Sequence, residues 1–297
     1  MLTRRQFVSR SVIGLMALSG TGLAIDGFFV EPHRPLPEHI DVHLTRLPEA
    51  FEGFRIAQIT DIHFGPYMDD PGLQRAVGLA QEFRPDLVAL TGDFVSHPLY
   101  QRNGVAGARN AEPCADVFAR WKGAPPMIAV LGNHDHWNNP DLVTGSLRER
   151  GIVVLRNAAH VIEREKHLLW IAGTDDALES RADVAQAIAQ IPPTDATILL
   201  AHEPDFADHA AKFPVDLQLS GHSHGGQVRL PGIGPIILPN LARKYHTGLN
   251  RVGRLQVFTS HGVGVINPPV RLNCPPKVSL LTLHKDMGNA ANHPGMP

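Results

Sequence analysis

The chain has 297 residues, of which 43% are hydrophobic and 19% charged, a composition typical of a soluble globular protein. This length can bury one substantial core or two small ones. The formal net charge of -2 provides no long-range attraction to nucleic acid, so a phosphate-bearing ligand would have to be held locally, by a metal or a few cations. Two cysteines, Cys114 and Cys274, are too few for a disulfide framework or a cysteine metal site.

Residues 1–30 differ in character from the rest of the chain. Arg4 and Arg5, followed by "QFV", precede an uncharged apolar run over residues 11–25. The run is shorter than the roughly 20 residues of a membrane-spanning helix, and its basic start resembles a twin-arginine export signal. We therefore expect export through the twin-arginine machinery to the periplasm or the membrane. A simple membrane anchor is the alternative, and cleavage after Ala24 stays open.

The segments that follow predict one layered α/β domain over residues 49–285. Residues 31–48 are proline-rich and polar, and are expected to form a linker or an edge segment; residues 286–297 are expected to be a flexible tail. Apolar runs typical of strands cover residues 55–60, 87–90, 127–130, 152–155, 168–173, 197–201, 215–220, 255–260 and 277–283.

Two amphipathic stretches between these runs predict helices. One covers residues 70–83, with Asp70 as the N-cap and Pro71 in the first turn. The other covers residues 180–191 and begins with Ser180 and Asp183 in capping-box spacing. Alternating strands and helices favour two sheets with helices on the outside.

Aspartate, asparagine and histidine side chains follow five of the predicted strands, often beside glycine. In chain order they are Asp61, His63, Asp93, Asn133, His202, His222 and His224. Side chains at the carboxyl ends of strands converge where α/β sheets bind ligands. The pairs two residues apart would point to one face of an extended backbone. Oxygen and imidazole ligands without thiolate suit Mn, Fe, Zn or related divalent ions.

With 17 histidines in the chain, any single match is weak evidence, whereas the ordered set is specific. The blocks Asp-x-His, Gly-Asp, Gly-Asn-His-Asp, His and Gly-His-x-His resemble the calcineurin-like metallophosphoesterases over residues 51–283. The stretches "LPEAFEGFRIAQITDIHFG" and "PPVRLNCPPKVSLLTL" are similar to a bacterial branch of exported or membrane-associated members. The resemblance implies a β-sandwich of two mixed sheets flanked by helices.

The resemblance also implies a site with two divalent metal ions. Asp61, His63 and His224 would hold the first ion, and Asn133, His202 and His222 the second. Asp93 would bridge both, because a carboxylate has two oxygens to offer. Such a pair of ions activates water and neutralises phosphate oxygens. His134 would protonate the departing oxygen or stabilise charge on the phosphoryl group.

Other residues near these blocks have less specific roles. Asp135 is expected to orient neighbouring groups, and Glu203 and Asp205 to be solvated or to lie just behind the ligands. Residues 225–250 are apolar and glycine-rich before they turn basic. They form either a packed connection or a wall that accepts an apolar group, with Arg243 or Lys244 holding a second phosphate.

The predicted function is a phosphodiesterase or pyrophosphate-type hydrolase that acts on an envelope, phospholipid or lipid-linked substrate. The chain reads "GDFVSHPL" where protein phosphatases of this superfamily read "GDxxDRG", which disfavours a protein phosphatase. Two alternatives remain: a membrane-anchored UDP-2,3-diacylglucosamine hydrolase, and a metal-binding module without turnover. No nucleic-acid partner is expected.

Overall fold

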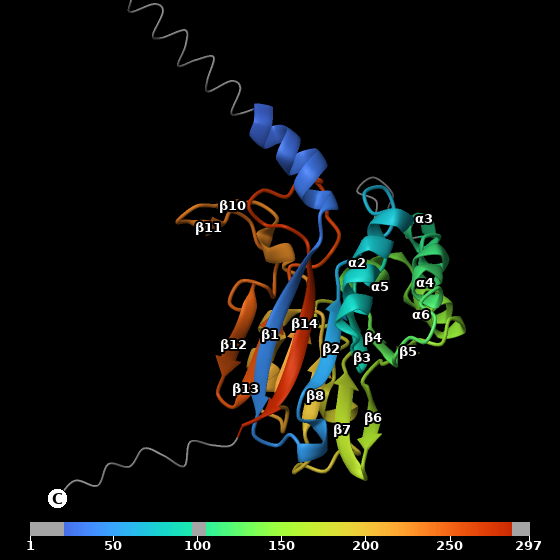
Figure 1. The fold of residues 1–297 in the computed structure, drawn as a ribbon, viewed down its shortest axis with the longest axis vertical. Coiled ribbons are helices and arrows are strands. Elements are labelled where there is room, and N and C mark those ends of the chain that lie inside the picture. Colours follow the sequence, from blue (N-terminus) through green and yellow to red (C-terminus); the bar gives the residue numbers. More distant parts are fainter. Residues whose placement is uncertain (1–20, 97–104, 287–297) are drawn as a thin grey trace, which may run out of the picture.

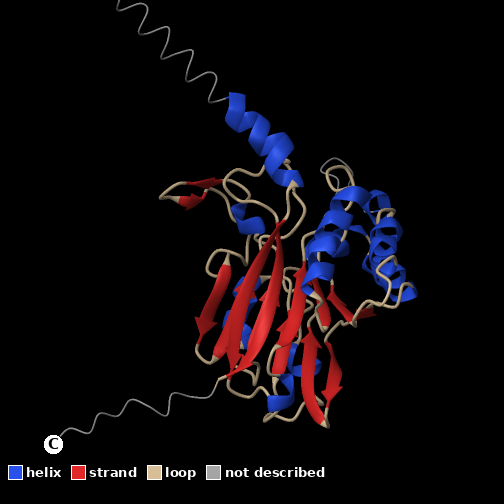
Figure 2. Ribbon diagram, in the orientation of Figure 1, coloured by secondary structure: helices blue, strands red, loops and turns tan. Residues whose placement is uncertain are grey.

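The computed structural model describes residues 21–96 and 105–286 as two stacked six-stranded sheets with helices on their outer faces (Figures 1 and 2). In the first sheet all neighbours are parallel except β14 and β2. Its strands, in spatial order, are β1 (Leu36–Leu44), β14 (Lys277–Lys285), β2 (Phe54–Ile59), β3 (Leu87–Thr91), β4 (Met127–Val130) and β5 (Val153–Val154).

The second sheet is also mixed, with four parallel strands between two antiparallel edge strands. In spatial order its strands are β12 (Gly248–Val252), β13 (Leu255–Thr259), β9 (Leu217–Ser220), β8 (Thr197–Leu200), β7 (His167–Gly173) and β6 (Ala158–Arg164). A separate hairpin pairs β10 (Arg229–Leu230) with β11 (Gly234–Pro235).

Three apolar clusters join the layers. The central one lies between the two sheets and includes Phe54, Ile128, Ile198 and Phe258. Every side chain of β3, β4, β8, β9 and β13 is buried, because these strands have a sheet on one face and helices or loops on the other. Strands of this kind read as continuous apolar runs, which is why they stand out in the sequence.

Helices complete the two outer layers. Against the first sheet pack α2 (Asp70–Phe83), α4 (Ala111–Ala119) and α6 (Pro140–Glu149). Against the second pack the single turns α7 (Val184–Ala187) and α8 (Ala207–Ala210). The short helices α3 (Val105–Ala108) and α5 (Asn133–Asn138) contact each other. Within the described residues, no helix is both long and apolar enough to cross a membrane.

The structure also contains an N-terminal helical segment and several short helical turns. Residues 21–25 are helical and continue into η1 (Asp26–Val30) and η2 (Glu31–His33). The others are η3 (Glu49–Phe51), η4 (Pro204–Phe206) and η5 (His224–Gly226).

The strand directions place one set of loops at one end of the molecule. Strand β1 leaves the N-terminal helical segment and runs parallel to β14, whereas β2 runs antiparallel to β14. The carboxyl ends of β2, β3 and β4 therefore lie at the same end as the N-terminal segment, the upper end in Figure 1.

The predicted fold class, an α/β layered sandwich of two mixed sheets with outer helices in a single domain, is confirmed, and all nine predicted strands are present. Residues 31–48 were expected to form a linker or an edge segment, and the structure agrees with the second alternative, since they contain the nine-residue edge strand β1. The proline and charge content of these residues is not typical of a strand. An ion pair between Lys277 of β14 and Glu38 of β1 contributes to the pairing of the two strands. Arg4 and Arg5 lie outside the described residues, as does nearly all of the expected tail.

The helix boundaries also differ from the prediction. The N-cap of α2 is Asp69, whose carboxylate accepts a hydrogen bond from the Gly72 amide at 2.8 Å, and Asp70 is the first helical residue. The second predicted helix shrinks to one turn, capped by Asp183 alone, while Ser180 adopts a positive φ of 56°. A capping pattern thus identified the start of that helix but not its length.

Replacing Asp69 with alanine should lower the free energy of unfolding by about 1 kcal/mol, because the Gly72 amide loses its partner. Asp70→Ala is the matched control: it removes exposed contacts with Arg120 and Gln74 and no helix cap, so its cost should be smaller. Urea unfolding of the two variants measures the difference. A larger loss for Asp70→Ala would contradict the assignment of the cap.

Candidate metal centre

All seven predicted ligands lie just beyond the carboxyl ends of five strands, in loops or at the first residue of a helical turn. Asp61 and His63 follow β2, Asp93 follows β3, Asn133 follows β4, His202 follows β8, and His222 and His224 follow β9. Each of them is at most 6% exposed. The two sheets thus bring segments that are far apart in the sequence to one buried place between their ends.

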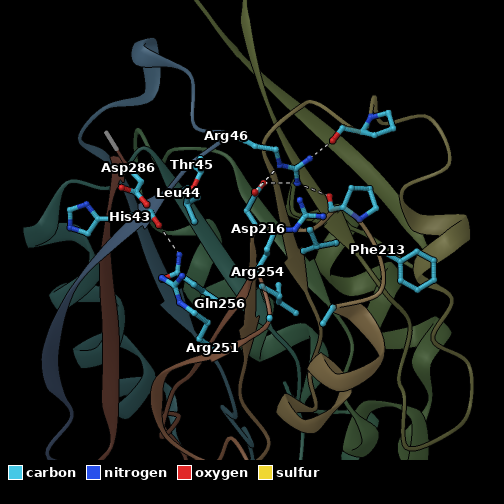
Figure 3. Close-up of a pocket in the computed structure, with 16 residues that line it drawn as sticks. His43, Leu44, Thr45, Arg46, Phe213, Asp216, Arg251, Arg254, Gln256 and Asp286 are labelled. Atoms are coloured by element: carbon cyan, nitrogen blue, oxygen red, sulfur yellow. Dashed lines mark hydrogen bonds and ion pairs between the residues drawn. The ribbon is translucent and has the colours of Figure 1, made fainter. Parts of the chain in front are cut away.

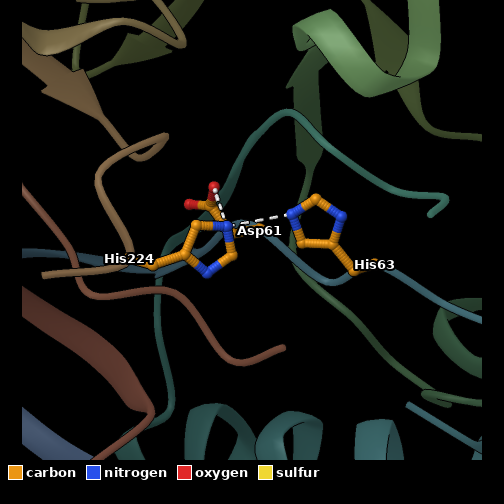
Figure 4. A group of neighbouring side chains, drawn as sticks. All are labelled: Asp61, His63 and His224. Carbon is orange, nitrogen blue, oxygen red and sulfur yellow. Dashed lines mark hydrogen bonds and ion pairs between the residues drawn. The ribbon is translucent and has the colours of Figure 1, made fainter. Parts of the chain in front are cut away.

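Asp61, His63 and His224 form a first cluster (Figure 4). Nε2 of His224 lies 3.4 Å from Oδ1 of Asp61 and 3.0 Å from Nε2 of His63. One carboxylate oxygen and two imidazole nitrogens that all lie within 4.8 Å of one another could share a single cation.

Asp93, His202 and His222 form a second cluster, and Asp93 also contacts the first. One oxygen of Asp93, Oδ2, lies 3.2 Å from Nε2 of His202 and 3.5 Å from Nε2 of His63. The structure therefore places Asp93 between the two clusters, where a shared ligand is expected.

Among the buried atoms of this region that have no hydrogen-bond partner are Oδ1 of Asn133 and Nε2 of His202. Buried polar atoms are almost always paired, so each such atom requires an explanation. Nδ1 of His202 lies 2.7 Å from the carbonyl oxygen of Thr91 and donates its proton there, which leaves Nε2 as the nitrogen that faces Oδ2 of Asp93, 3.2 Å away. Both atoms fit a metal ligand, as does the donor set of carboxylate, amide oxygen and imidazole.

The ionisation of the cluster is governed by burial. Burial lowers the pKa of His222 to about 4 and lowers the pKa of His63 and His224 well below the ordinary value, so all three imidazoles are neutral at pH 7. Burial raises the pKa of Asp61. Burial also opposes ionisation of Asp93, but the neighbouring imidazoles of His202 and His134 outweigh it and lower the pKa of that carboxyl.

The ligand loops have unusual backbone conformations. Asp61, His63, Asp93, His222 and His224 all have positive φ values, between 49° and 65°. The expectation that residues two apart point to one face of an extended strand is therefore wrong here, because β2 and β9 end before the ligands. His222 and His224 even join different clusters. Such conformations in residues other than glycine are costly and concentrate at functional sites.

Glycine is required where these loops approach one another. A Cβ on Gly221 would lie 2.2 Å from Oδ2 of Asp61, and the amide after it, on His222, donates to both oxygens of that carboxylate. Gly92 has a φ of 98°, and its Cβ would lie 2.7 Å from Nδ1 of His202. The glycines predicted to permit sharp turns thus also make room for the ligands.

His134 and Asp135 follow Asn133 at the start of α5. The His134 amide donates to Oδ1 of Asp93 at 2.9 Å, and its ring lies edge-on to that of His63, with centroids 4.6 Å apart. Asp135 is fully buried and accepts hydrogen bonds from the amides of Phe94 and Gly132. It ties the Asp93 loop to the Asn133 loop, as an orienting residue would.

Glu203, one of the two acids expected to be solvated or to lie behind the ligands, is buried, and its Oε2 accepts from the Ala177 amide. Asp205 accepts from the amides of Arg243 and Lys244. Lys244 also forms an ion pair with Asp208, so its charge is already balanced.

Arg271, for which the sequence predicted no role, is fully buried behind the ligands. Its guanidinium donates to the carbonyl oxygens of Gly264, His261 and Cys274 at 2.7–2.9 Å. These contacts brace the segments around His224 with a buried cation that has no paired carboxylate. The position of this arginine among apolar and proline residues in "PPVRLNCPP" could have indicated that it is buried.

A cavity of about 290 Å³ lies at the opposite end of the sheets and does not include any of the ligands (Figure 3). Arg46 lines it, but its guanidinium already binds both oxygens of Asp216 and a carbonyl oxygen of Pro214. Arg46 thus links the segment after β1 in the first sheet to the segment before β9 in the second sheet. The cavity is therefore separate from the buried cluster of predicted ligands.

Comparison with known proteins agrees with this geometry. The family model of the calcineurin-like phosphoesterases matches residues 54–226. The chain is 30% identical to the uncharacterized metallophosphoesterase YkuE of Bacillus subtilis, over 95% of this chain and 98% of that protein. It is 30% identical to the phosphodiesterase YaeI of Escherichia coli, over 95% of this chain and all of that protein. Among solved structures, a 5'-nucleotidase precursor from Thermus thermophilus aligns with a TM-score of 0.45 at 14% identity, covering 77% of this chain and 54% of that one.

The fold and the buried cluster of carboxylates and imidazoles define a metal-dependent phosphoesterase. The chain belongs to the calcineurin-like phosphoesterase family, and the resemblance inferred from the sequence is confirmed at that level. Members of this family use divalent metal ions, with which the clustered side chains agree.

Gly221→Ala should displace Asp61 and reduce both bound metal and activity, because the new methyl group would overlap its carboxylate. Gly145→Ala is the matched control: nothing lies within 4 Å of that Cβ, and alanine in a helix should stabilise the protein by about 0.5–1 kcal/mol. Metal analysis and thermal unfolding of both variants test this. Full metal content in Gly221→Ala would show that the close approach is not needed.

Proposed function

We propose that the protein is a two-metal phosphodiesterase or pyrophosphate-type hydrolase of the cell envelope, acting on a phospholipid or other lipid-linked phosphate. The observation that carries the proposal is the position of Asp93 between two buried clusters of ligands. A binuclear site needs one ligand that reaches both ions, and a carboxylate is suited to this.

The residues present fit such a pair of ions. Asp61, His63 and His224 would hold one of them. Asn133, His202 and His222 would hold the other, with Asp93 shared. Bound Mn, Fe or Zn would supply Lewis acidity that activates a water molecule and offsets the charge of a phosphate. Burial holds the imidazoles of His63, His222 and His224 neutral, and the neighbouring imidazoles keep the Asp93 carboxylate charged, as coordination requires.

His134 is the residue that we assign to proton transfer. Its amide bond to Asp93 and its ring contact with His63 fix it beside both clusters, while its side chain is less buried than the ligands. In this position it would protonate the departing oxygen of the ester or stabilise charge on the phosphoryl group.

Two features support a diester or pyrophosphate substrate at the envelope. YaeI, which shares 30% identity over nearly the whole chain, is named a phosphodiesterase. Residues 1–25 have the composition of an export signal or anchor, which would take the protein to the periplasm or the membrane. Since Lys244 is paired with Asp208, Arg243 is the remaining candidate to hold a second phosphate.

The purified full chain should retain divalent metal and hydrolyse bis-p-nitrophenyl phosphate at least about tenfold faster than p-nitrophenyl phosphate. Asp93→Ala removes the shared ligand and should lose both metal and activity, whereas His167→Ala, an exposed histidine of β7, should lose neither. Elemental analysis and steady-state kinetics measure these effects. A preference for the monoester, or activity in metal-free protein, would overturn the proposal.

His134→Ala should keep its metal and lose about 10²–10⁴ in kcat, the usual contribution of a general acid. The loss should be larger for a diester with an alkyl leaving group than for one with p-nitrophenolate, which needs no proton to depart. Equal losses for both leaving groups would assign His134 to charge stabilisation instead. An unchanged rate would remove it from the reaction.

A further inference from the structure

The most exposed apolar side chains of the described residues gather on two segments. Every large apolar side chain that is more than half exposed belongs either to the N-terminal helical segment or to the loop around the β10–β11 hairpin. The most exposed are Phe29, Ile233 and Ile237, at 72%, 76% and 77%. The side chains more than half exposed are Leu23, Ile25, Phe29, Ile233, Ile236 and Ile237. Together with their neighbours Phe28 and Leu230, which are 42% and 39% exposed, we call them the apolar end surface.

The two segments lie on the same end of the molecule and are joined by the backbone around Arg271. Its amide donates to the carbonyl oxygen of Gly27 at 2.9 Å, and the Arg229 amide donates to the carbonyl oxygen of Leu272 at 3.0 Å. Figure 1 shows the hairpin and the N-terminal helix together at the upper end, where the metal-centre loops also lie. The apolar end surface is therefore one region of the protein.

The β10–β11 hairpin exposes apolar side chains to solvent. Its strands have two residues each and pair only with each other within the described chain. Residues 230–242 contain no charged side chain, although they are exposed at three isoleucines, and Arg229 and Arg243 flank them. An exposed apolar patch of this kind marks an interaction site. An apolar loop between cations is typical of a segment that enters the interface of an anionic membrane.

We propose that the apolar end surface docks on an anionic lipid bilayer, with Ile233, Ile236 and Ile237 inserted at the interface. The sequence of the N-terminal segment favours a membrane over a second protein as the partner of this surface. The apolar run of residues 11–25 enters the described structure at this end, and residues 1–25 contain three arginines and no acid. The hairpin and the N-terminal run would thus meet the same membrane.

Docking would also place the metal centre at the membrane surface. The hairpin lies in the connection between His224 and Asn240, and the Asn240 carbonyl oxygen accepts a hydrogen bond from Nε2 of His222. Phe28 and Phe29 form one wall of an open groove of about 570 Å³, and Tyr67 lines it as well. A lipid phosphate would then lie near the ligands, a consequence that rests on the proposed function.

Sedimentation of the full chain with vesicles of phosphatidylcholine and phosphatidylglycerol in equal parts tests the docking. Serine at Ile233, Ile236 and Ile237 together should weaken binding at least about tenfold, because three exposed side chains lose their burial in lipid. The matched control carries serine at Leu142, Val161 and Leu249, which are 38–41% exposed elsewhere, and should bind like the original chain. Equal binding of both triple variants would overturn the role of the hairpin.

A tryptophan reporter distinguishes insertion from an indirect effect on folding. Ile237→Trp should be quenched by brominated phosphatidylcholine in these vesicles, whereas Val161→Trp on β6 should not. Quenching at Val161 that equals that at Ile237, or a dimer in which the Ile237 reporter is shielded from lipid, would overturn the proposal. Binding is measured without turnover, so a chain that docks but does not cleave diesters would refute only the proposed function.

Discussion

The constraint on which the structure depends is the burial of two carboxylates among histidines with little access to water. Asp61 and Asp93 are 0% and 1% exposed, and a charge taken out of water is costly unless it is paired. Amides compensate part of the cost: His222 and His134 donate theirs to Asp61 and Asp93. Oδ1 of Asn133 has no hydrogen-bond partner among the described residues and is available as a ligand. Cations are the compensation that this donor set favours.

The sandwich supplies the rigidity that such a site requires. Parallel strands from both sheets end at one place, so the ligands are attached to the best-packed part of the molecule. The loops then adopt left-handed conformations at five ligands, each of which costs stability. Asp135 and the buried Arg271 hold these loops through backbone amides and carbonyls. The stability of the packed core thus offsets the cost of the strained backbone at the ligands.

Sequence reasoning predicted the buried strands and the membership of the site, but not how the site is built. Strands such as "MIAV" are buried on both faces and therefore read as apolar runs, whereas β1 and β12 alternate at sheet edges and were missed. The ligands could be recognised because their types and order are specific. Their left-handed backbone could not, since spacing alone suggested extended geometry. Arg271 was missed because its partners are main-chain carbonyls, which leave no pattern in the side chains.

The end of the molecule that holds the ligands differs physically from the opposite end. At the far end, Arg46 and Asp216 pair and close the space between strands. At the ligand end, apolar side chains remain exposed on a hairpin that leads from His224 to Asn240, whose carbonyl oxygen contacts His222 in the same ligand loop. Exposing isoleucine to water is unfavourable, and a hairpin with two-residue strands gains little from its own hydrogen bonds. The exposed isoleucines would be stabilised if a membrane covered them. That membrane would then lie beside the predicted metal ligands.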